Sequence, residues 1–272
     1  MAPYFGRGPS GRTPLCGSLR KLFDMYQQYM EAGRRVLIIV ITDGEPSDGD
    51  VTQLFDVLAG ALQRGWLVTG ASRSGHGIDG ARHLCIDPAS PGFKAEQLAN
   101  STPYTAVCWA QGANCTDSVY DVDPHQHMEI YSANVGYILT TLKALLAGGM
   151  LAPATRMCVI SSIWQNLARQ SKLSYCVSKA ALQGLVLSAA ADMAKDGHLI
   201  NAVLPGAIDT PMTQRNLSSE QMQRLTAATG FGRLASLEDV TSLALYLCSP
   251  DNTGITGQFI ATDLGFSHVR IV

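Results

Sequence analysis

Charged side chains are scarce in this chain: Asp, Glu, Lys and Arg make up 15% of its 272 residues, against roughly a quarter in most soluble proteins. The net charge is only -2 and no run of Lys and Arg exceeds two residues, so nothing indicates nucleic-acid or anionic-membrane binding. The longest aliphatic run, Val36–Ile41, is too short to span a bilayer. The first residues lack the apolar stretch of a signal peptide. These absences predict a soluble, cytoplasmic protein.

Paired cysteines are also missing. The seven cysteines are odd in number and form no CxxC pair, which argues against a disulfide framework or a zinc site. Most lie in apolar segments, where a free cysteine behaves as a small hydrophobic side chain. A reducing compartment is therefore expected. The seven are Cys16, Cys85, Cys108, Cys115, Cys158, Cys176 and Cys248.

What the chain does contain is a regular alternation of apolar runs and longer amphipathic stretches. The expected strands are Arg35–Thr42, Trp66–Ala71, Arg82–Ile86, Thr105–Ala110, Arg156–Ser161, Leu199–Leu204 and Gly257–Ala261. The expected helices are Asp50–Arg64, Gly92–Asn100, Pro124–Ala147, Ser174–Lys195, Ser218–Thr229 and Leu237–Cys248. This order predicts an α/β fold, a doubly wound, Rossmann-like parallel sheet of about seven strands. We expect a single domain over residues 35–272, preceded by an extension and helix over residues 1–34.

One group of side chains carries a chemical signal. Tyr175 and Lys179 open a long apolar helix, four residues apart and therefore on one face. A nearby ammonium stabilises phenolate, so the pair suits acid/base chemistry near neutrality. Ser162 ends an upstream strand at the carboxyl edge of the sheet, where ligands of this fold gather. Asn134 lies in the helix before that strand, where satisfying a neighbouring carbonyl is a competing explanation for it.

These residues resemble the short-chain dehydrogenases/reductases over roughly residues 59–272. Ser162 precedes Tyr175 by 13 residues, a spacing typical of that family. Three further segments match in order: Pro205-Gly206, Thr210-Pro211-Met212 and Gly254–Gln258. The resemblance implies catalytic roles for Asn134, Ser162, Tyr175 and Lys179, hydride exchange between an alcohol or carbonyl and a nicotinamide cofactor, and a homo-oligomer joined through Pro124–Ala147 and Ser174–Lys195.

The part of the sequence that would bind the cofactor can be aligned with the family in two ways. Thr69–Gly77 looks like the family's Gly-rich phosphate turn, but only about 40 residues then separate it from the fourth-strand motif, too few for two βα units. We prefer Arg35–Thr42 as the first strand, which puts Ser72-Arg73 at the end of the second, where a cation favours NADP(H) over NAD(H). The cofactor-binding residues predicted this way are Gly44, Gly49, Ser72, Arg73, Asp87, Gly112, Tyr175, Lys179, Pro205, Gly206, Ile208 and Thr210.

The first turn is then unusually acidic, because four carboxylates between Asp43 and Asp50 would face the pyrophosphate and repel it. Residues 11–50 also resemble part of a von Willebrand factor A domain, with Thr13 and Asp43 at metal-binding positions. The DxSxS turn of that family is missing, and two ligands make a weak site, so no metal is predicted. The alternative function is a chimeric or scaffold protein with a reductase fold that has lost its cofactor.

The substrate itself is not readable from the sequence. Ile163–Ser171 and Met212–Arg233 follow strand ends and are expected to line and cover the pocket, with Trp164, Gln165 and Met212 as candidate contacts. His125 and Glu129 share one helix face while His127 points elsewhere, which favours a solvated helix over a metal site.

Overall fold

The computed structural model describes residues 37–41, 51–73, 79–209, 213 and 218–269. The chain divides into two units, Met1–Arg35 and Val36–Val272, and everything below concerns the second. Several predicted features lie outside the described residues. They are the extension and helix of residues 1–34, Thr13, Asp43, Gly44, Gly49, Thr210 and Met212.

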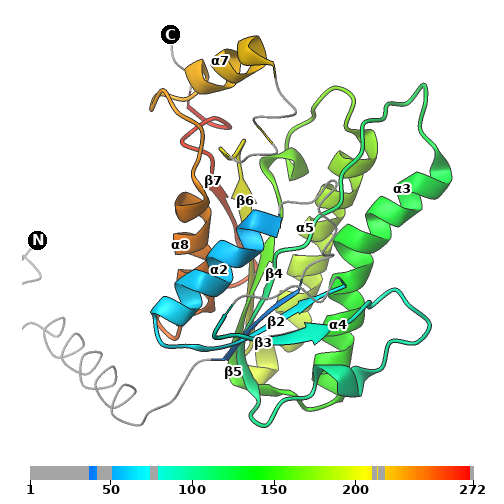
Figure 1. The fold of residues 1–272 in the computed structure, drawn as a ribbon, viewed down its shortest axis with the longest axis vertical. Helices are drawn as coiled ribbons and strands as arrows, with labels where there is room; N and C mark the ends of the chain where they lie inside the picture. The colour runs from blue at the N-terminus through cyan, green and yellow to red at the C-terminus, as the bar shows by residue number, and fades with distance from the viewer. Residues whose placement is uncertain (1–36, 42–50, 74–78, 210–212, 214–217, 270–272) are drawn as a thin grey trace, which may run out of the picture. The chain divides into compact units, whose positions relative to one another are not determined.

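A parallel sheet forms the centre of the fold (Figure 1), with strand order β3-β2-β1-β4-β5-β6-β7. The strands are β1 Leu37–Ile41, β2 Leu67–Ser72, β3 Arg82–Cys85, β4 Tyr104–Trp109, β5 Leu151–Ile160, β6 Leu199–Pro205 and β7 Phe259–Thr262. Every neighbouring pair is parallel. The predicted α/β class with a doubly wound parallel sheet is confirmed. All strand carboxyl ends therefore meet at one edge, where ligands of such sheets bind.

The sheet order also bears on the two alignments of the cofactor end. β1 lies between β2 and β4, with Ile39 opposite both Thr69 and Val107. The segment Thr69–Ser72 is thus inside the second strand, as the preferred alignment expected, and not a turn after the first. A Cβ on Gly70 would approach a Leu58 methyl group to 3.4 Å, so this glycine serves close packing of helix on strand.

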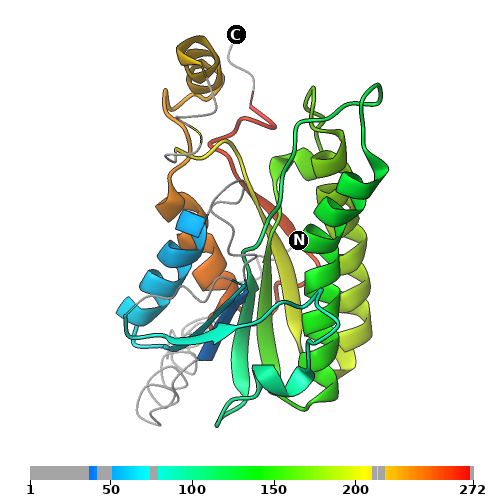
Figure 2. The ribbon, with the colours of Figure 1, turned by 45° about the vertical axis from the view of Figure 1, so that its right-hand side comes forward.

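Two helical layers cover the sheet (Figure 2). Helices α2 (Val51–Gln63) and α8 (Leu237–Cys248) cover one face, and α3 (Pro124–Tyr131), α4 (Tyr137–Ala147) and α5 (Leu173–Met193) cover the other. Each layer buries its own apolar cluster, one represented by Leu58 and Leu245 and the other by Trp109 and Met157. Full burial of each large apolar side chain contributes about 1.5–3 kcal/mol.

Three elements differ from the sequence predictions. The predicted helix Gly92–Asn100 is only a 3₁₀ turn, Ala95–Leu98, because Leu98 alone is buried and the chain is extended again at Ala99. The predicted strand Arg156–Ser161 begins earlier, at Leu151, and carries an irregular register opposite Tyr104 and Ala106. The predicted helix Pro124–Ala147 is interrupted by a π-helical segment, Ser132–Gly136.

Three further helical segments complete the described fold. They are the 3₁₀ turns η3 (Ile163–Gln165) and η4 (Ala194–Asp196) and the helix α7 (Ser219–Ala227). Capping boxes start α7 at Ser218 and α8 at Ser236, and each satisfies backbone N–H groups that the helix leaves unpaired.

Candidate active site

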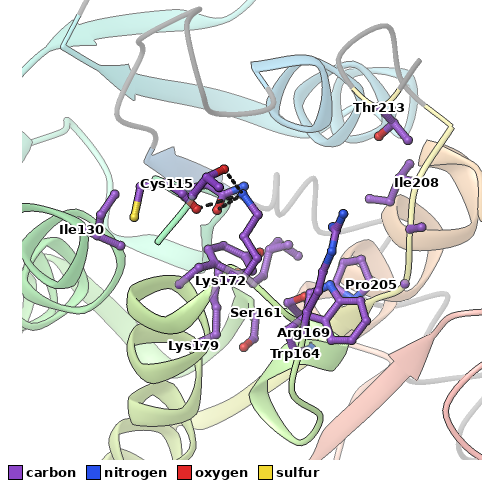
Figure 3. A pocket seen from close by; sticks show the side chains of 18 of the residues that line it. Cys115, Ile130, Ser161, Trp164, Arg169, Lys172, Lys179, Pro205, Ile208 and Thr213 are labelled. Carbon is purple, nitrogen blue, oxygen red and sulfur yellow. Dashed lines mark hydrogen bonds between the residues drawn. The ribbon is translucent and has the colours of Figure 1, made fainter. Parts of the chain in front are cut away.

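A cavity of about 1030 Å³ opens at the carboxyl edge of the sheet (Figure 3). Its walls come from segments that follow three neighbouring strands, together with the first turns of α5. They include Ala110–Gly112 after β4, Ile160–Ser162 at the end of β5, Tyr175 and Lys179 on α5, and Pro205–Ile208 after β6. The fold thus brings Ser162, Tyr175 and Lys179 together, as the sequence predicted, along with Gly112, Pro205, Gly206 and Ile208 from the cofactor set.

Ser162 and Tyr175 lie together in the wall of this cavity. Ser162 precedes η3, and its Oγ accepts a hydrogen bond from the Trp164 backbone N–H at 3.3 Å. Burial raises the pKa of the Tyr175 hydroxyl above its usual value, while a hydrogen bond with Ser162 and the charge of Arg169 act in the opposite direction. Since burial dominates, the hydroxyl holds its proton at neutral pH.

Lys179 lies under Tyr175 on the same helix face. Its buried Nζ is 5.7 Å from the centre of the Tyr175 ring and donates to the Ile160 carbonyl at 3.1 Å. The predicted shared face is confirmed. The predicted lowering of the Tyr175 pKa toward neutrality is not what the structure shows, because burial of the phenol outweighs the effects that lower it.

Asn134 sits in the π-helical segment, and its side chain is fully engaged. Its Oδ1 accepts from the Ala113 N–H at 2.7 Å, and its Nδ2 donates to the Ala113 carbonyl at 3.0 Å and to Ser178 Oγ at 2.8 Å. The amide therefore joins the segment after β4 to helix α5. The competing explanation from the sequence, an amide satisfying a neighbouring carbonyl, describes these contacts; its role in proton relay stays a prediction.

Gln111 is the site residue that sequence reasoning missed. It lines the cavity, is only 3% exposed, and neither its Oε1 nor its Nε2 has a hydrogen-bond partner among the described residues. An unpaired buried amide costs roughly 1–3 kcal/mol. The sequence shows Gln111 where the family motif has alanine, but only the structure shows the amide to be unpaired.

Gly112 and Gly206 give the cavity room near these groups. A Cβ on Gly112 would lie 3.5 Å from Lys179 Nζ and 3.9 Å from Asn134 Oδ1. A Cβ on Gly206 would lie 2.8 Å from Asp263 Cβ, so no side chain fits there without movement. Gly112 thus lies beside Lys179 and Asn134, and Gly206 lets its backbone pack closely against Asp263.

The predicted residues for the adenosine end lie outside the wall of this cavity. Ser72 Oγ is 3.1 Å from His83 Nε2, and the Arg73 carbonyl accepts from Cys85 Sγ at 3.3 Å. Asp87 accepts from the Tyr137 hydroxyl at 2.9 Å. Because β2 and β3 end at the same sheet edge as β4, these residues lie along that edge, across the end of β1 from Gln111.

A buried network fixes the start of helix α5. Asp117 accepts from the Ser174 backbone N–H at 3.1 Å and also from the Ser174 hydroxyl. His127 Nδ1 lies 2.8 Å from that hydroxyl, and Lys172 Nζ donates to the Cys115 carbonyl at 2.8 Å. These contacts place the first turn of α5, and with it Tyr175, against the segment that follows β4. Nothing in the residue pattern pointed to Asp117, because its contacts join segments 57 residues apart.

The structure also locates His125, His127 and Glu129, which the sequence analysis placed on one helix. His125 Nδ1 and Glu129 Oε1 lie 3.4 Å apart on an exposed face of α3, while His127 points to Ser174, as the helical spacing predicted. Among the described residues, no three His, Cys, Asp or Glu side chains are grouped as metal ligands.

Trp164 lines the cavity, but Gln165 does not. Its Oε1 instead accepts from Ser161 Oγ at 2.8 Å, which corrects its assignment as a substrate contact.

Comparisons with known proteins agree with this geometry. The model of the family described as enoyl-(acyl carrier protein) reductase matches residues 105–267. The uncharacterized oxidoreductase YmfI of Bacillus subtilis is 28% identical over 176 residues, 63% of this chain and 72% of that protein. The 3-oxoacyl-[acyl-carrier-protein] reductase FabG of Salmonella typhimurium is 29% identical over 141 residues, 52% of this chain and 57% of FabG.

Solved structures share the fold. A gluconate 5-dehydrogenase from Burkholderia cenocepacia, in complex with NADP and tartrate, superposes with a TM-score of 0.74 at 19% identity, covering 86% of this chain and 96% of that one. At this identity the likeness concerns the fold alone.

Proposed function

The chain belongs to the short-chain dehydrogenase/reductase family, and on that premise we propose that it is an NADP(H)-dependent oxidoreductase that interconverts an alcohol and a carbonyl. The observation that carries the proposal is the meeting of Ser162, Tyr175 and Lys179 in one cavity at the carboxyl edge of the sheet. Relatives with oxidoreductase names, including FabG, support the general class.

The proposed reaction depends on the proton of the Tyr175 hydroxyl. Ser162 Oγ is placed to donate to the substrate oxygen, and Tyr175 gives its proton to that oxygen as the carbonyl becomes an alcohol. A raised Tyr175 pKa keeps this proton on the hydroxyl at neutral pH, and the protonated hydroxyl is the form that donates to a carbonyl. Lys179 holds a buried positive charge beside the ring, which stabilises the phenolate left behind. Asn134 fixes the segment after β4 against α5 and, by family resemblance, anchors a relaying water.

The cavity offers groups that suit the nicotinamide and ribose of a dinucleotide. The unpaired Gln111 amide offers both a donor and an acceptor to a ligand, and Gly112 leaves space beside Lys179 Nζ for a ribose. When bound, the dinucleotide supplies or accepts the hydride. The chain's own contribution is orientation and electrostatics.

We propose NADP(H) over NAD(H) because Arg73 follows the end of β2. A cation there pairs with the 2′-phosphate. The gluconate 5-dehydrogenase of similar fold is itself in complex with NADP. The proposed contact set is the one predicted from the sequence, with Gly44, Gly49, Ser72, Arg73, Asp87, Gly112, Tyr175, Lys179, Pro205, Gly206, Ile208 and Thr210.

We also propose a homo-oligomer, formed through the outer faces of α4 and α5. These faces leave large apolar side chains in solvent: Leu139 is 52%, Val177 42% and Leu187 49% exposed. Helix α5 is apolar and long enough to cross a membrane by length and composition. Its inner face, however, carries the buried polar residues Ser178 and Lys179, and Lys179 lines the cavity. We therefore propose that a second copy of the chain, and not a membrane, covers the outer face.

Free thiols support the proposal of a cytoplasmic enzyme. The six cysteines within the described residues are all unpaired. Cys108 and Cys158 face each other as register partners on β4 and β5 and are both buried, yet they form no disulfide. This state is typical of a reducing compartment.

The direct test of the proposed function measures hydride transfer from NADPH to a carbonyl substrate. The protein is incubated with NADPH deuterated at the transferable position and a panel of ketones and oxo acids, and the alcohol products are analysed by mass spectrometry. We expect deuterium on the carbinol carbon with wild-type protein and none with Tyr175→Phe, which should fold normally. Deuterium transfer by the Tyr175→Phe variant would contradict the assignment of Tyr175.

A further inference from the structure

Arg169 is one of the cationic side chains of the cavity that the proposed chemistry does not use. It follows η3, and its guanidinium carbon lies 5.9 Å from the centre of the Trp164 ring. Both side chains line the same cavity as Ser162 and Tyr175, and Figure 3 shows Arg169 beside Trp164 with its charged end in the cavity. Its charge is close enough to Tyr175 to lower the pKa of that hydroxyl.

The other charged side chains on the outer part of the cavity wall each have a contact partner within the chain. Lys172 Nζ donates to Asn114 Oδ1, the Cys115 carbonyl and Thr116 Oγ1. Arg224 pairs with Glu220 at 2.6 Å, and Glu129 pairs with His125. Within the described part of the chain, Arg169 makes neither an ion pair nor a hydrogen bond. Arg169 is therefore the cationic side chain near Tyr175 that is available to pair with a ligand.

The surroundings of Arg169 prepare it to bind an anion. The face of Trp164 attracts the guanidinium and restricts it, and Trp164 is itself held edge-on against Phe266, with ring centres 6.3 Å apart. A guanidinium offers a planar fork of N–H donors that matches a carboxylate or phosphate, and it stays charged at any physiological pH. A neutral ketone or sugar would leave this charge unpaired.

We propose that Arg169 binds an anionic group of the substrate, so that the enzyme acts on carbonyl compounds that carry a carboxylate or a phosphate a few bonds from the reacting carbon. This inference rests on the proposed function, since the reacting carbon is the one that Ser162 and Tyr175 address. It narrows the substrate class to oxo acids or phosphorylated ketones, with the corresponding hydroxy compounds in the reverse direction.

Matched substrate pairs test the proposal. We compare kcat/KM with NADPH for acetoacetate against methyl acetoacetate, and for dihydroxyacetone phosphate against dihydroxyacetone. The variants are Arg169→Met, Arg169→Lys and, as a control outside the cavity, Arg64→Met. Wild-type protein should prefer at least one anion over its neutral partner, and the responding pair identifies the carboxylate or the phosphate.

Arg169→Met should lower kcat/KM for that anion by roughly 10- to 100-fold more than for its neutral partner, the loss expected for a charge-assisted pair. Any effect of the lost charge on the Tyr175 hydroxyl is shared by the two partners. Arg169→Lys should fall between, because an ammonium lacks the fork. Arg64→Met should stay within about twofold for every substrate, because Arg64 is exposed at the end of α2 and does not line the cavity. Equal rates for anion and neutral partner in the wild type, or an equal loss of both in Arg169→Met, would overturn the proposal.

A binding measurement separates this inference from the proposed function. If the protein turns over none of these compounds, acetoacetate and methyl acetoacetate are titrated calorimetrically into wild-type and Arg169→Met protein without nucleotide. Acid-selective binding that Arg169→Met abolishes would uphold the anion site while the oxidoreductase assignment fails. Equal affinity for acid and ester would overturn the anion site.

Discussion

At the scale of single residues, the site depends on where one proton resides. Burial raises the pKa of Tyr175, and the hydrogen bond with Ser162 and the charge of Arg169 only partly oppose this effect. The free protein therefore presents a neutral phenol beside the buried ammonium of Lys179. A neutral phenol is the form that donates a proton to a carbonyl, and phenolate is the form that accepts one from an alcohol.

The pH dependence should follow from this. Because the acid form persists at pH values above the ordinary tyrosine pKa of about 10, kcat/KM for carbonyl reduction should be flat through neutral pH. It should fall only in alkaline solution. Alcohol oxidation should instead rise with pH over the whole neutral range. Steady-state rates in both directions between pH 6 and about 10.5 test this, and a reductive rate that already falls between pH 6 and 8 would contradict it.

Replacing Gln111 should raise the stability of the free protein but weaken the stabilisation that NADPH confers. Gln111→Met removes a buried amide that lacks partners, so the free protein should gain about 1 kcal/mol of stability. The same change should reduce the stabilisation that NADPH confers. Thermal unfolding with and without NADPH measures both effects.

Gln165→Met is the matched control for Gln111→Met. The Gln165 side chain is also buried, but its Oε1 accepts from Ser161 Oγ, so its loss should destabilise the free protein. A Gln111→Met variant with an unchanged response to NADPH would rule out contact between this amide and the dinucleotide.

At the scale of helices and strands, most of the fold could be predicted from the sequence. Apolar runs such as Leu199–Pro205 are buried on both faces, and capping residues such as Ser236 mark helix starts locally. The failures arise where contacts between distant segments decide the structure. The π-helical segment around Asn134 accompanies bonds to Ala113 and Ser178, which are 21 and 44 residues away.

The candidate site, like the fold, could be predicted where residues close in the sequence determine the geometry. Tyr175 and Lys179 are four residues apart on one helix, so their meeting follows from helical geometry alone. The unpaired state of Gln111 and the bond between Gln165 and Ser161 depend on packing, which no local pattern encodes. The turn after β1 lies outside the described residues, so its predicted role stays a prediction.

Helix α5 supplies the prediction at this scale. Asp117→Asn replaces a buried carboxylate that accepts from the Ser174 N–H and hydroxyl at the first turn of the helix. The unfolding free energy should fall by about 1–2 kcal/mol, as for other lost helix caps. Carbonyl reduction should slow, because Tyr175 follows Ser174 directly. Urea unfolding and kcat are measured together.

Asp121→Asn serves as the control for this variant. Asp121 accepts from the Ser118 N–H at 2.7 Å in an exposed turn, so its replacement should leave kcat unchanged. If Asp117→Asn keeps the full kcat with only its stability reduced, Asp117 does not position Tyr175.

At the scale of the whole molecule, the parallel sheet explains why distant segments form one cavity. The segments after β4, β5 and β6 are separated by tens of residues in the chain, yet they end side by side because β4, β5 and β6 are neighbours in the sheet. The helical layer of α4 and α5 leaves an apolar outer face, which we expect a second copy to cover.

The proposed assembly can be disrupted at that face. Val177→Glu combined with Leu187→Glu places two charges on the outer face of α5, where both native side chains are more than 40% exposed. Wild-type protein should elute as an oligomer in size-exclusion chromatography with light scattering, and the double variant should elute as a smaller species. Monomeric wild-type protein would contradict the proposal.

The central claim is that the edge of this sheet binds a nicotinamide dinucleotide. A calorimetric titration of NADPH and NADH into wild-type and Arg73→Ala protein tests it most directly. The account predicts NADPH binding with a dissociation constant on the order of micromolar, weaker binding of NADH, and a loss of NADPH affinity in Arg73→Ala. Absence of binding for both nucleotides would contradict the account and favour the alternative, a reductase fold whose acidic first turn has abolished cofactor binding.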